Sequence, residues 1–121
     1  MIRRFDRLEI TTTDLADAAS TYRKNFGFDV APDSGSDEAT IIVAESEIRL
    51  RSGPAVADLI AAAGEGLAGI WLEADDVYQV AAVLQNAGVV VSAVRSEGGR
   101  RFMTVAPESA NMVRLFVFDR R

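Results

Sequence analysis

The stretch that decides the fold is GIWLEADDVYQVAAVLQNAGVVV, residues 69–91, because it repeats the pattern of RLEITTTDLADAASTYRKNFGFDV at residues 7–30. When the two are aligned, Asp76 falls on Asp14. Before each aspartate the residues alternate with period two, and after it apolar residues recur at helical spacing. Each copy therefore predicts a strand followed by a helix.

Both predicted helices carry start and stop signals. Asp14 and Asp76 are expected to be N-caps, because their carboxylates can accept the free N–H groups of the first helical turn. Gly27 and Gly88 fit the ends of the helices, where a left-handed backbone conformation is common. Capping accounts for both aspartates, so we assign neither of them to chemistry.

Three strands are expected after the first helix. PDSGSDE at residues 32–38 has the composition of a loop. The first strand opens at Phe28, before that loop, and ATIIVA (39–44) and EIRLRS (47–52) are the next two, joined by a tight turn around Ser46.

The second half repeats this order. VSAVRSEGGRRFMTVAP at residues 91–107 is typical of a hairpin with its turn at Gly98 and Gly99. We expect EGGRR to be a plain turn, with a mobile lid as the alternative. NMVRLFVFD (111–119) is the expected closing strand, and it aligns with EIRLRSG so that Arg114 lies on Arg49.

A period of about 60 residues indicates two copies of one βαβββ module in a single α+β domain. Module one is assigned to residues 1–53 and module two to residues 68–121. The connector at residues 54–67 is rich in small residues and is expected to hold a short helix at Val56–Ala63.

The composition excludes several classes of protein. With 13 basic and 18 acidic residues the net charge is −5, which disfavours non-specific nucleic-acid binding. No apolar run is long enough to span a membrane, so we expect a cytoplasmic protein. The sequence has no cysteine and no histidine, so it lacks thiolate ligands and also the commonest general base and metal ligand.

The order of elements, with the phrases DLADAASTYRKNFGF and EADDVYQVAAVLQNAGVVV, resembles the vicinal-oxygen-chelate superfamily. That superfamily includes glyoxalase I, extradiol dioxygenases and bleomycin resistance proteins. The resemblance implies that the two modules form a curled sheet, or cup, with the helices on its convex side and the ligand on its concave side. Arg7 and Glu9 would then face the ligand, while Leu8 and Ile10 pack beneath the helix.

The resemblance also identifies where metal ligands would lie. Metal-binding relatives carry a His, Glu or Gln at one position in each of the two first and two fourth strands. The matching residues here are Arg7, Arg49, Gly69 and Arg114. Arginine offers only hydrogen-bond donors and glycine has no side chain, so we expect no metal ion and no other cofactor.

The same resemblance predicts a ligand-binding surface. Three arginines at former ligand positions could hold a carboxylate or phosphate, and Trp71 and Phe116 could supply stacking surface. The predicted ligand-binding residues are Arg7, Glu9, Arg49, Arg51, Trp71, Glu73, Arg114 and Phe116. Two alternatives to ligand binding stay open. The arginines could pair with glutamates that only neutralise the concave face, and Trp71 could serve ordinary packing.

These residues support a pocket better than a reaction. The first hypothesis is a metal-free, homodimeric binding protein for a small anionic or aromatic molecule. The second is an isomerase, lyase or dioxygenase-related enzyme in which Glu9 or Glu73 acts as general base and arginines act as electrophiles. Nearby arginines favour the ionised carboxylate, which argues against that role. A third hypothesis is a degenerate copy kept for dimerisation or regulation.

Overall fold

The computed structural model describes residues 1–32 and 37–120, so most of the expected loop at 32–38 lies outside the described residues. In chain order the elements are β1 (Ile2–Thr11), α1 (Leu15–Phe26), β2 (Val30–Pro32), β3 (Glu38–Val43), β4 (Ser46–Arg51), α2 (Pro54–Ala63), β5 (Gly66–Ala74), α3 (Val77–Asn86), β6 (Arg95–Glu97), β7 (Arg100–Val105), the 3₁₀ turn η1 (Pro107–Ser109) and β8 (Leu115–Asp119). The α+β class and the repeated order of one strand, one helix and three strands are as expected.

The chain forms two compact units. The first-module unit is Arg7–Ala68, and the second-module unit is Met1–Asp6 together with Gly69–Arg121. The residues of strand β1 up to Asp6 belong to the second-module unit, and those from Arg7 onward belong to the first-module unit.

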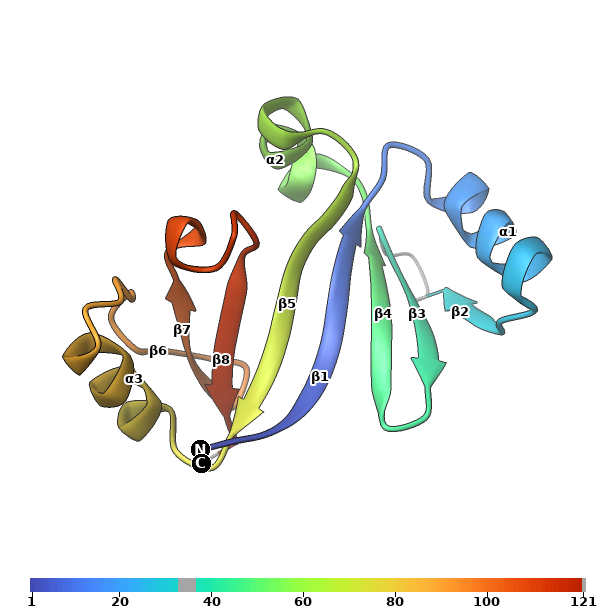
Figure 1. The fold of residues 1–121 in the computed structure, drawn as a ribbon. Coiled ribbons are helices and arrows are strands. Elements are labelled where there is room, and N and C mark those ends of the chain that lie inside the picture. The colour runs from blue at the N-terminus through green and yellow to red at the C-terminus, as the bar shows by residue number, and fades with distance from the viewer. Residues whose placement is uncertain (33–36, 121) are drawn as a thin grey trace. The chain divides into compact units, whose positions relative to one another are not determined.

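In the first-module unit the strand order is β2-β3-β4-β1, with β1 parallel to β4 and the other pairs antiparallel (Figure 1). Helix α1 packs on one face of these strands through Ala19, against Ile41 and Leu50, which are fully buried. Ile10 and Ile48 join this cluster, as the period-two pattern predicts.

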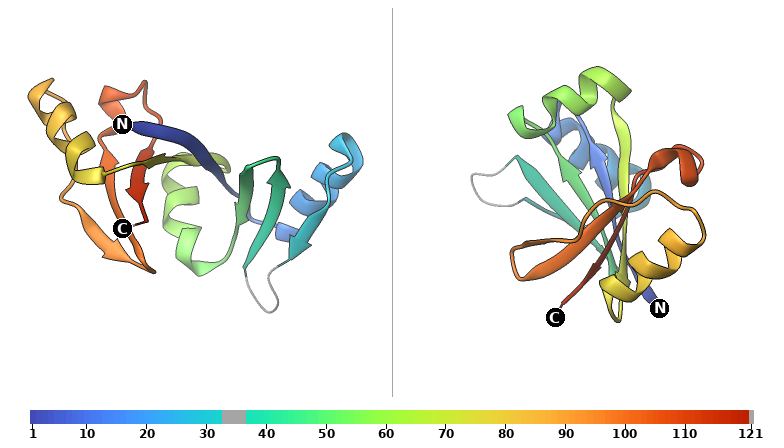
Figure 2. Two further views of the ribbon diagram at one scale, coloured as in Figure 1. Left: turned by 90° about the horizontal axis from the view of Figure 1, so that it is seen from below. Right: turned by 90° about the vertical axis from the view of Figure 1, so that its left-hand side faces the viewer.

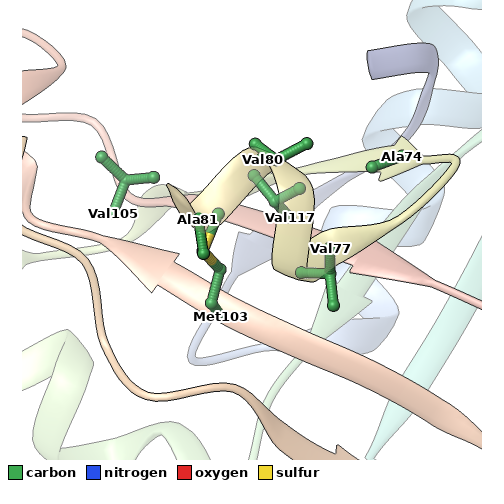
Figure 3. Close-up of a cluster of buried hydrophobic side chains, with 7 residues drawn as sticks. All are labelled: Ala74, Val77, Val80, Ala81, Met103, Val105 and Val117. Carbon is green, nitrogen blue, oxygen red and sulfur yellow. The ribbon is translucent and has the colours of Figure 1, made fainter. Parts of the chain in front are cut away.

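The second-module unit has the equivalent strand order β5-β8-β7-β6, with β5 parallel to β8. Helix α3 covers one face of these strands, where its side chains meet Met103 and Val117 (Figure 3). In both views of Figure 2 the turn of the β6–β7 hairpin points away from α3. The turn lies at Gly98 and Gly99, as predicted.

The helix caps are also as predicted. Asp14 accepts the backbone N–H of Asp17 at 3.0 Å, and Asp76 accepts that of Tyr78 at 2.9 Å. Gly27 ends α1 with φ of 70°, a left-handed conformation that glycine adopts without steric cost.

Several boundaries differ from the sequence predictions, and β2 begins at Val30 rather than Phe28. The β3–β4 turn is at Ala44 and Glu45, since Ser46 already pairs with Val43. Helix α2 begins at Pro54 rather than Val56, because proline suits the first helical position, where no N–H is needed.

The closing strand begins at Leu115 rather than Asn111. Asn111 and Met112 have φ of 53° and 66°, which is incompatible with a strand, and the Met112 N–H donates to the carbonyl of Pro107 at 2.8 Å. Met112 is therefore an exposed loop residue and not, as predicted, part of the closing strand.

Within the described part of the chain, no helix is long and apolar enough to cross a membrane.

A buried carboxylate joins α3 to the sheet. Asp119, only 1% exposed, accepts the Val77 N–H at the start of α3 at 2.8 Å and both the Nε and Nη2 donors of Arg101. Hydrogen bonding to Asp119 raises the pKa of the Arg101 guanidinium, which also lies over the Tyr78 ring. One side chain thus satisfies donors from both a helix and a neighbouring strand.

We expect Asp119→Ala to lower the free energy of unfolding by about 3 kcal/mol, because the change leaves the Arg101 charge and a buried N–H without their acceptor. Urea denaturation followed by the emission of the single tryptophan measures this. Asp58→Ala, at an exposed position of α2, is the control and is expected to stay within about 0.5 kcal/mol of the parent. A loss of stability below about 1 kcal/mol for Asp119→Ala would contradict the role of Asp119 in joining α3 to the sheet.

Candidate functional site

Strand alternation places the predicted site residues, apart from Arg114, on the faces opposite α1 and α3. In the first-module unit we call this the charged face, and its members are Arg7, Glu9, Glu38, Glu47, Arg49 and Arg51. In the second-module unit we call it the aromatic face, and its members are Trp71, Phe102, Phe116 and Phe118. Each face is described separately below.

Glu9 lies at the centre of the charged face. It is only 8% exposed, and its two carboxylate oxygens lie 3.5 Å from Arg7 Nη2 and 3.2 Å from Arg51 Nη1. One buried carboxylate is thus shared by two guanidinium groups that come from neighbouring parallel strands.

Arg49 is held in the same way by two other glutamates. Its Nη2 lies 2.9 Å from Glu47 and its Nη1 lies 3.5 Å from Glu38, which is also 3.5 Å from Arg51 Nε. Burial lowers the pKa of Arg49, but the two carboxylates outweigh burial and raise it.

The charged face therefore carries three arginines and three glutamates, with a formal net charge of zero. This agrees with the alternative in which Arg–Glu pairs neutralise the face. Ligand contact by Arg7, Glu9, Arg49 and Arg51 stays a prediction.

Trp71 is the centre of the aromatic face. Its ring stacks on Phe116 with centroids 4.4 Å apart and planes 5° apart, and it also contacts Phe102 at 5.7 Å and Phe118 at 5.9 Å. Phe118 is fully buried, whereas Trp71 and Phe116 are only partly buried. Trp71 therefore packs against three phenylalanine rings and remains partly exposed.

The stack depends on Gly69. A Cβ atom at this position would lie 2.7 Å from Phe116 Cε2, closer than real contacts allow. The Phe116 ring therefore occupies the space where a side chain of residue 69 would project, which gives this glycine a steric role.

Glu73 lies on the same side of β5 as Trp71 and is 7% exposed. Its Oε1 accepts Arg4 Nε at 2.9 Å and lies 3.5 Å from Arg120 Nε. Asp6, also buried, shares both arginines at 2.8 and 3.6 Å. Arg4, Asp6 and Arg120 are not among the site residues predicted from the sequence, although alternation along IRRFD could have placed Arg4 and Asp6 on one face.

Arg114 lies immediately before β8 and is exposed, and its backbone carbonyl accepts the Ile70 N–H at 2.9 Å. It belongs to the second-module unit, whereas Arg7 and Arg49 belong to the first. Convergence of the three guanidinium groups stays a prediction.

The residues at the four family ligand positions do not fit a metal ion. Arg7 and Arg49 are ion-paired cations, Gly69 lies against the Phe116 ring, and Arg114 offers only donors. Over residues 1–32 and 37–120, no three His, Cys, Asp or Glu side chains come together in a way that could hold a metal ion.

Two βαβββ modules, each with a helix on one sheet face, define a glyoxalase-like class of protein. The family described as the Glyoxalase/Bleomycin resistance protein/Dioxygenase superfamily matches residues 4–116, and the chain belongs to it. This confirms the resemblance seen in the sequence. No curated protein matches the chain.

Solved structures show the same fold. A protein of Bacillus halodurans C-125 described only as hypothetical is 18% identical with a TM-score of 0.79, covering 98% of this chain and 94% of that one. A variant of the Streptomyces coelicolor methylmalonyl-CoA epimerase, in complex with 2-nitronate-propionyl-CoA, is 23% identical with a TM-score of 0.75, covering 98% and 95%. The Mycobacterium tuberculosis methylmalonyl-CoA epimerase is 18% identical with a TM-score of 0.75, covering 99% and 89%.

We expect Gly69→Ala to disrupt the Trp71–Phe116 stack and to cost about 1 kcal/mol, because the ring must move away from the new methyl group. Near-ultraviolet circular dichroism reports the stack, and urea denaturation reports the stability. In a double-mutant cycle, Phe116→Leu should remove most of the penalty of Gly69→Ala, since it removes the ring edge that clashes. Additive effects of the two changes would show that the contact does not constrain residue 69.

We expect Glu9→Gln to lower the free energy of unfolding by about 2 kcal/mol, because Arg7 and Arg51 lose the buried carboxylate that they share, even though Arg51 keeps Glu38. Glu47→Gln should cost less, since Arg49 keeps Glu38. The control, Glu108→Gln at an exposed position of η1, should change stability by less than about 0.5 kcal/mol. Equal losses for all three variants in urea denaturation would rule out a central role for Glu9.

Proposed function

We propose that this protein binds a small aromatic or anionic molecule, without a bound metal ion, on the aromatic face of its second-module unit. The observation that carries the proposal is the Trp71–Phe116 stack, which is partly exposed on the sheet face opposite α3. Small-molecule sites are mostly apolar and aromatic with a few polar groups, and Glu73, Arg4 and Arg120 supply such groups here.

The chemistry of the former ligand positions supports binding without a metal ion. A divalent cation near Arg7 and Arg49 would be repelled by both guanidinium groups and would have to compete with them for glutamates already paired. Elemental analysis of the dialysed protein is the direct check, and a stoichiometric divalent metal would overturn this part of the proposal.

Calorimetric titration with 2-naphthol and 2-naphthoate tests binding itself. We expect saturable binding of one molecule per chain, and we expect Phe116→Leu to weaken it at least fivefold because the stacked surface is lost. The control is Phe26→Leu, which alters an aromatic side chain that is 64% exposed on α1 and should leave affinity unchanged. Absence of saturation, or equal affinities for both variants, would refute the proposed site.

A second candidate function is proton abstraction from a bound ligand. It is favoured by the likeness in fold to methylmalonyl-CoA epimerases and by a buried carboxylate, Glu73, beside the aromatic face. Turnover would appear as slow exchange of solvent deuterium into a bound ligand, detected by mass spectrometry and lost in Glu73→Gln. A ligand recovered without deuterium favours binding alone.

A further inference from the structure

We propose that the ligand of the aromatic face is a planar carboxylate or similar anion whose charged group is held by Arg95 and Arg100. This inference rests on the proposed function and adds the charge of the ligand and two residues that bind it. The sequence analysis did not select either arginine as a ligand contact.

Arg95 and Arg100 differ from the arginines of the charged face. Arg95 Cζ lies 5.1 Å from the centroid of Phe102, and Arg100 Cζ lies 4.9 Å from that of Phe118. Within the described residues neither guanidinium forms an ion pair, although Glu97 is the residue opposite Arg100 in the strand register. The aromatic face thus carries cationic charge that no carboxylate of the described chain balances.

Contact with a ring leaves these guanidinium groups able to bind an anion. A guanidinium that lies flat on a ring makes this contact through its face, whereas its N–H donors lie in the plane and project from the edge. A carboxylate can therefore accept a pair of hydrogen bonds from a guanidinium that remains over its ring. The ring also removes water from one side of the cation, which strengthens its attraction for an anion.

A third arginine adds to the positive potential. Arg120 Cζ lies 5.4 Å from the centroid of Phe118, the same ring that Arg100 covers. In the antiparallel register of β7 and β8, Arg101 lies opposite Asp119. Arg100 and Arg120 are therefore the next two residues to lie opposite each other. Like charges at such positions repel each other, and of these two arginines it is Arg120 that pairs with Asp6 and Glu73. An anion beside Arg100 would relieve this repulsion.

The strand register sets the expected size of the ligand. Phe116 lies opposite Trp71, and Phe118, two residues further along β8, lies opposite Phe102. The Trp71 ring centroid lies 5.7 Å from that of Phe102 and 5.9 Å from that of Phe118, so the stack lies directly beside the arginine-covered rings. A bicyclic aromatic carboxylate spans this distance better than a single ring does.

The test compares three probes by calorimetry: 2-naphthoate, the neutral 2-naphthamide and the non-planar cyclohexanecarboxylate. We expect 2-naphthoate to bind at least tenfold more tightly than the other two, because only it satisfies both the stack and the arginines. Arg100→Met should weaken 2-naphthoate about tenfold and leave 2-naphthamide unchanged, which also shows that the variant is folded. Arg95→Met should act in the same direction.

Arg3→Met is the matched control, because Arg3 is an exposed arginine of the same unit that pairs with Asp75 instead. It should not change the affinity for 2-naphthoate. Equal affinities for 2-naphthoate and 2-naphthamide, or equal losses in Arg100→Met and Arg3→Met, would overturn the inference while the proposed function stands. If none of the three probes binds, the proposed function itself fails.

Discussion

The parallel pairing of first and last strands within each module is the constraint on which the candidate sites depend. Glu9 lies beside Arg49 because β1 and β4 run in the same direction, and Trp71 lies beside Phe116 because β5 and β8 do. With a side-chain period of two, a slip of one residue would exchange the face that meets the helix for the face that carries the site. The apolar cluster under each helix therefore also fixes the register of the functional residues.

The two modules use this constraint in different ways. In the first, each arginine of the charged face lies against a glutamate, so the face is polar and electrically balanced. In the second, the corresponding strands carry aromatic rings, and arginines from the β6–β7 hairpin lie over them. The two modules share the order of elements and the packing of a helix on one face, while their opposite faces differ in chemistry.

Much of the fold was predictable because its signals are local. The repeat of residues 7–30 in residues 69–91, the caps at Asp14 and Asp76 and the glycine turn of the hairpin all depend on neighbouring residues. The start of β8 could not be predicted, because the alternation of residues continues through Met112 although the backbone at Met112 is left-handed. Whether Asn111 and Met112 turn back toward Pro107 depends on a hydrogen bond that hydropathy does not report.

The site was predictable in part for the same reason. Alternation selected Trp71, Phe116 and Glu73, and the structure places all three on one side of the second-module sheet. The partners of Glu73 come from segments distant in the sequence. Alternation along IRRFD could group Arg4 with Asp6, but it could not show that Arg4 and Arg120 meet Glu73. Arg95 and Arg100 were missed because their role follows from which rings lie across β7 and β8.

A site for anions can be built from arginine side chains without a metal ion. A metal ion attracts ligand oxygens through concentrated charge, whereas a guanidinium does so through directed donors spread over a plane. Guanidinium donors can bind a ligand anion only when no carboxylate of the protein already occupies them. A buried Arg–Glu pair gains little net stability and leaves few donors for a ligand. The charged face has paired arginines and the aromatic face has arginines whose partners are rings. Anion recognition is therefore expected where the cation meets an aromatic ring, away from the positions at which relatives hold a metal ion.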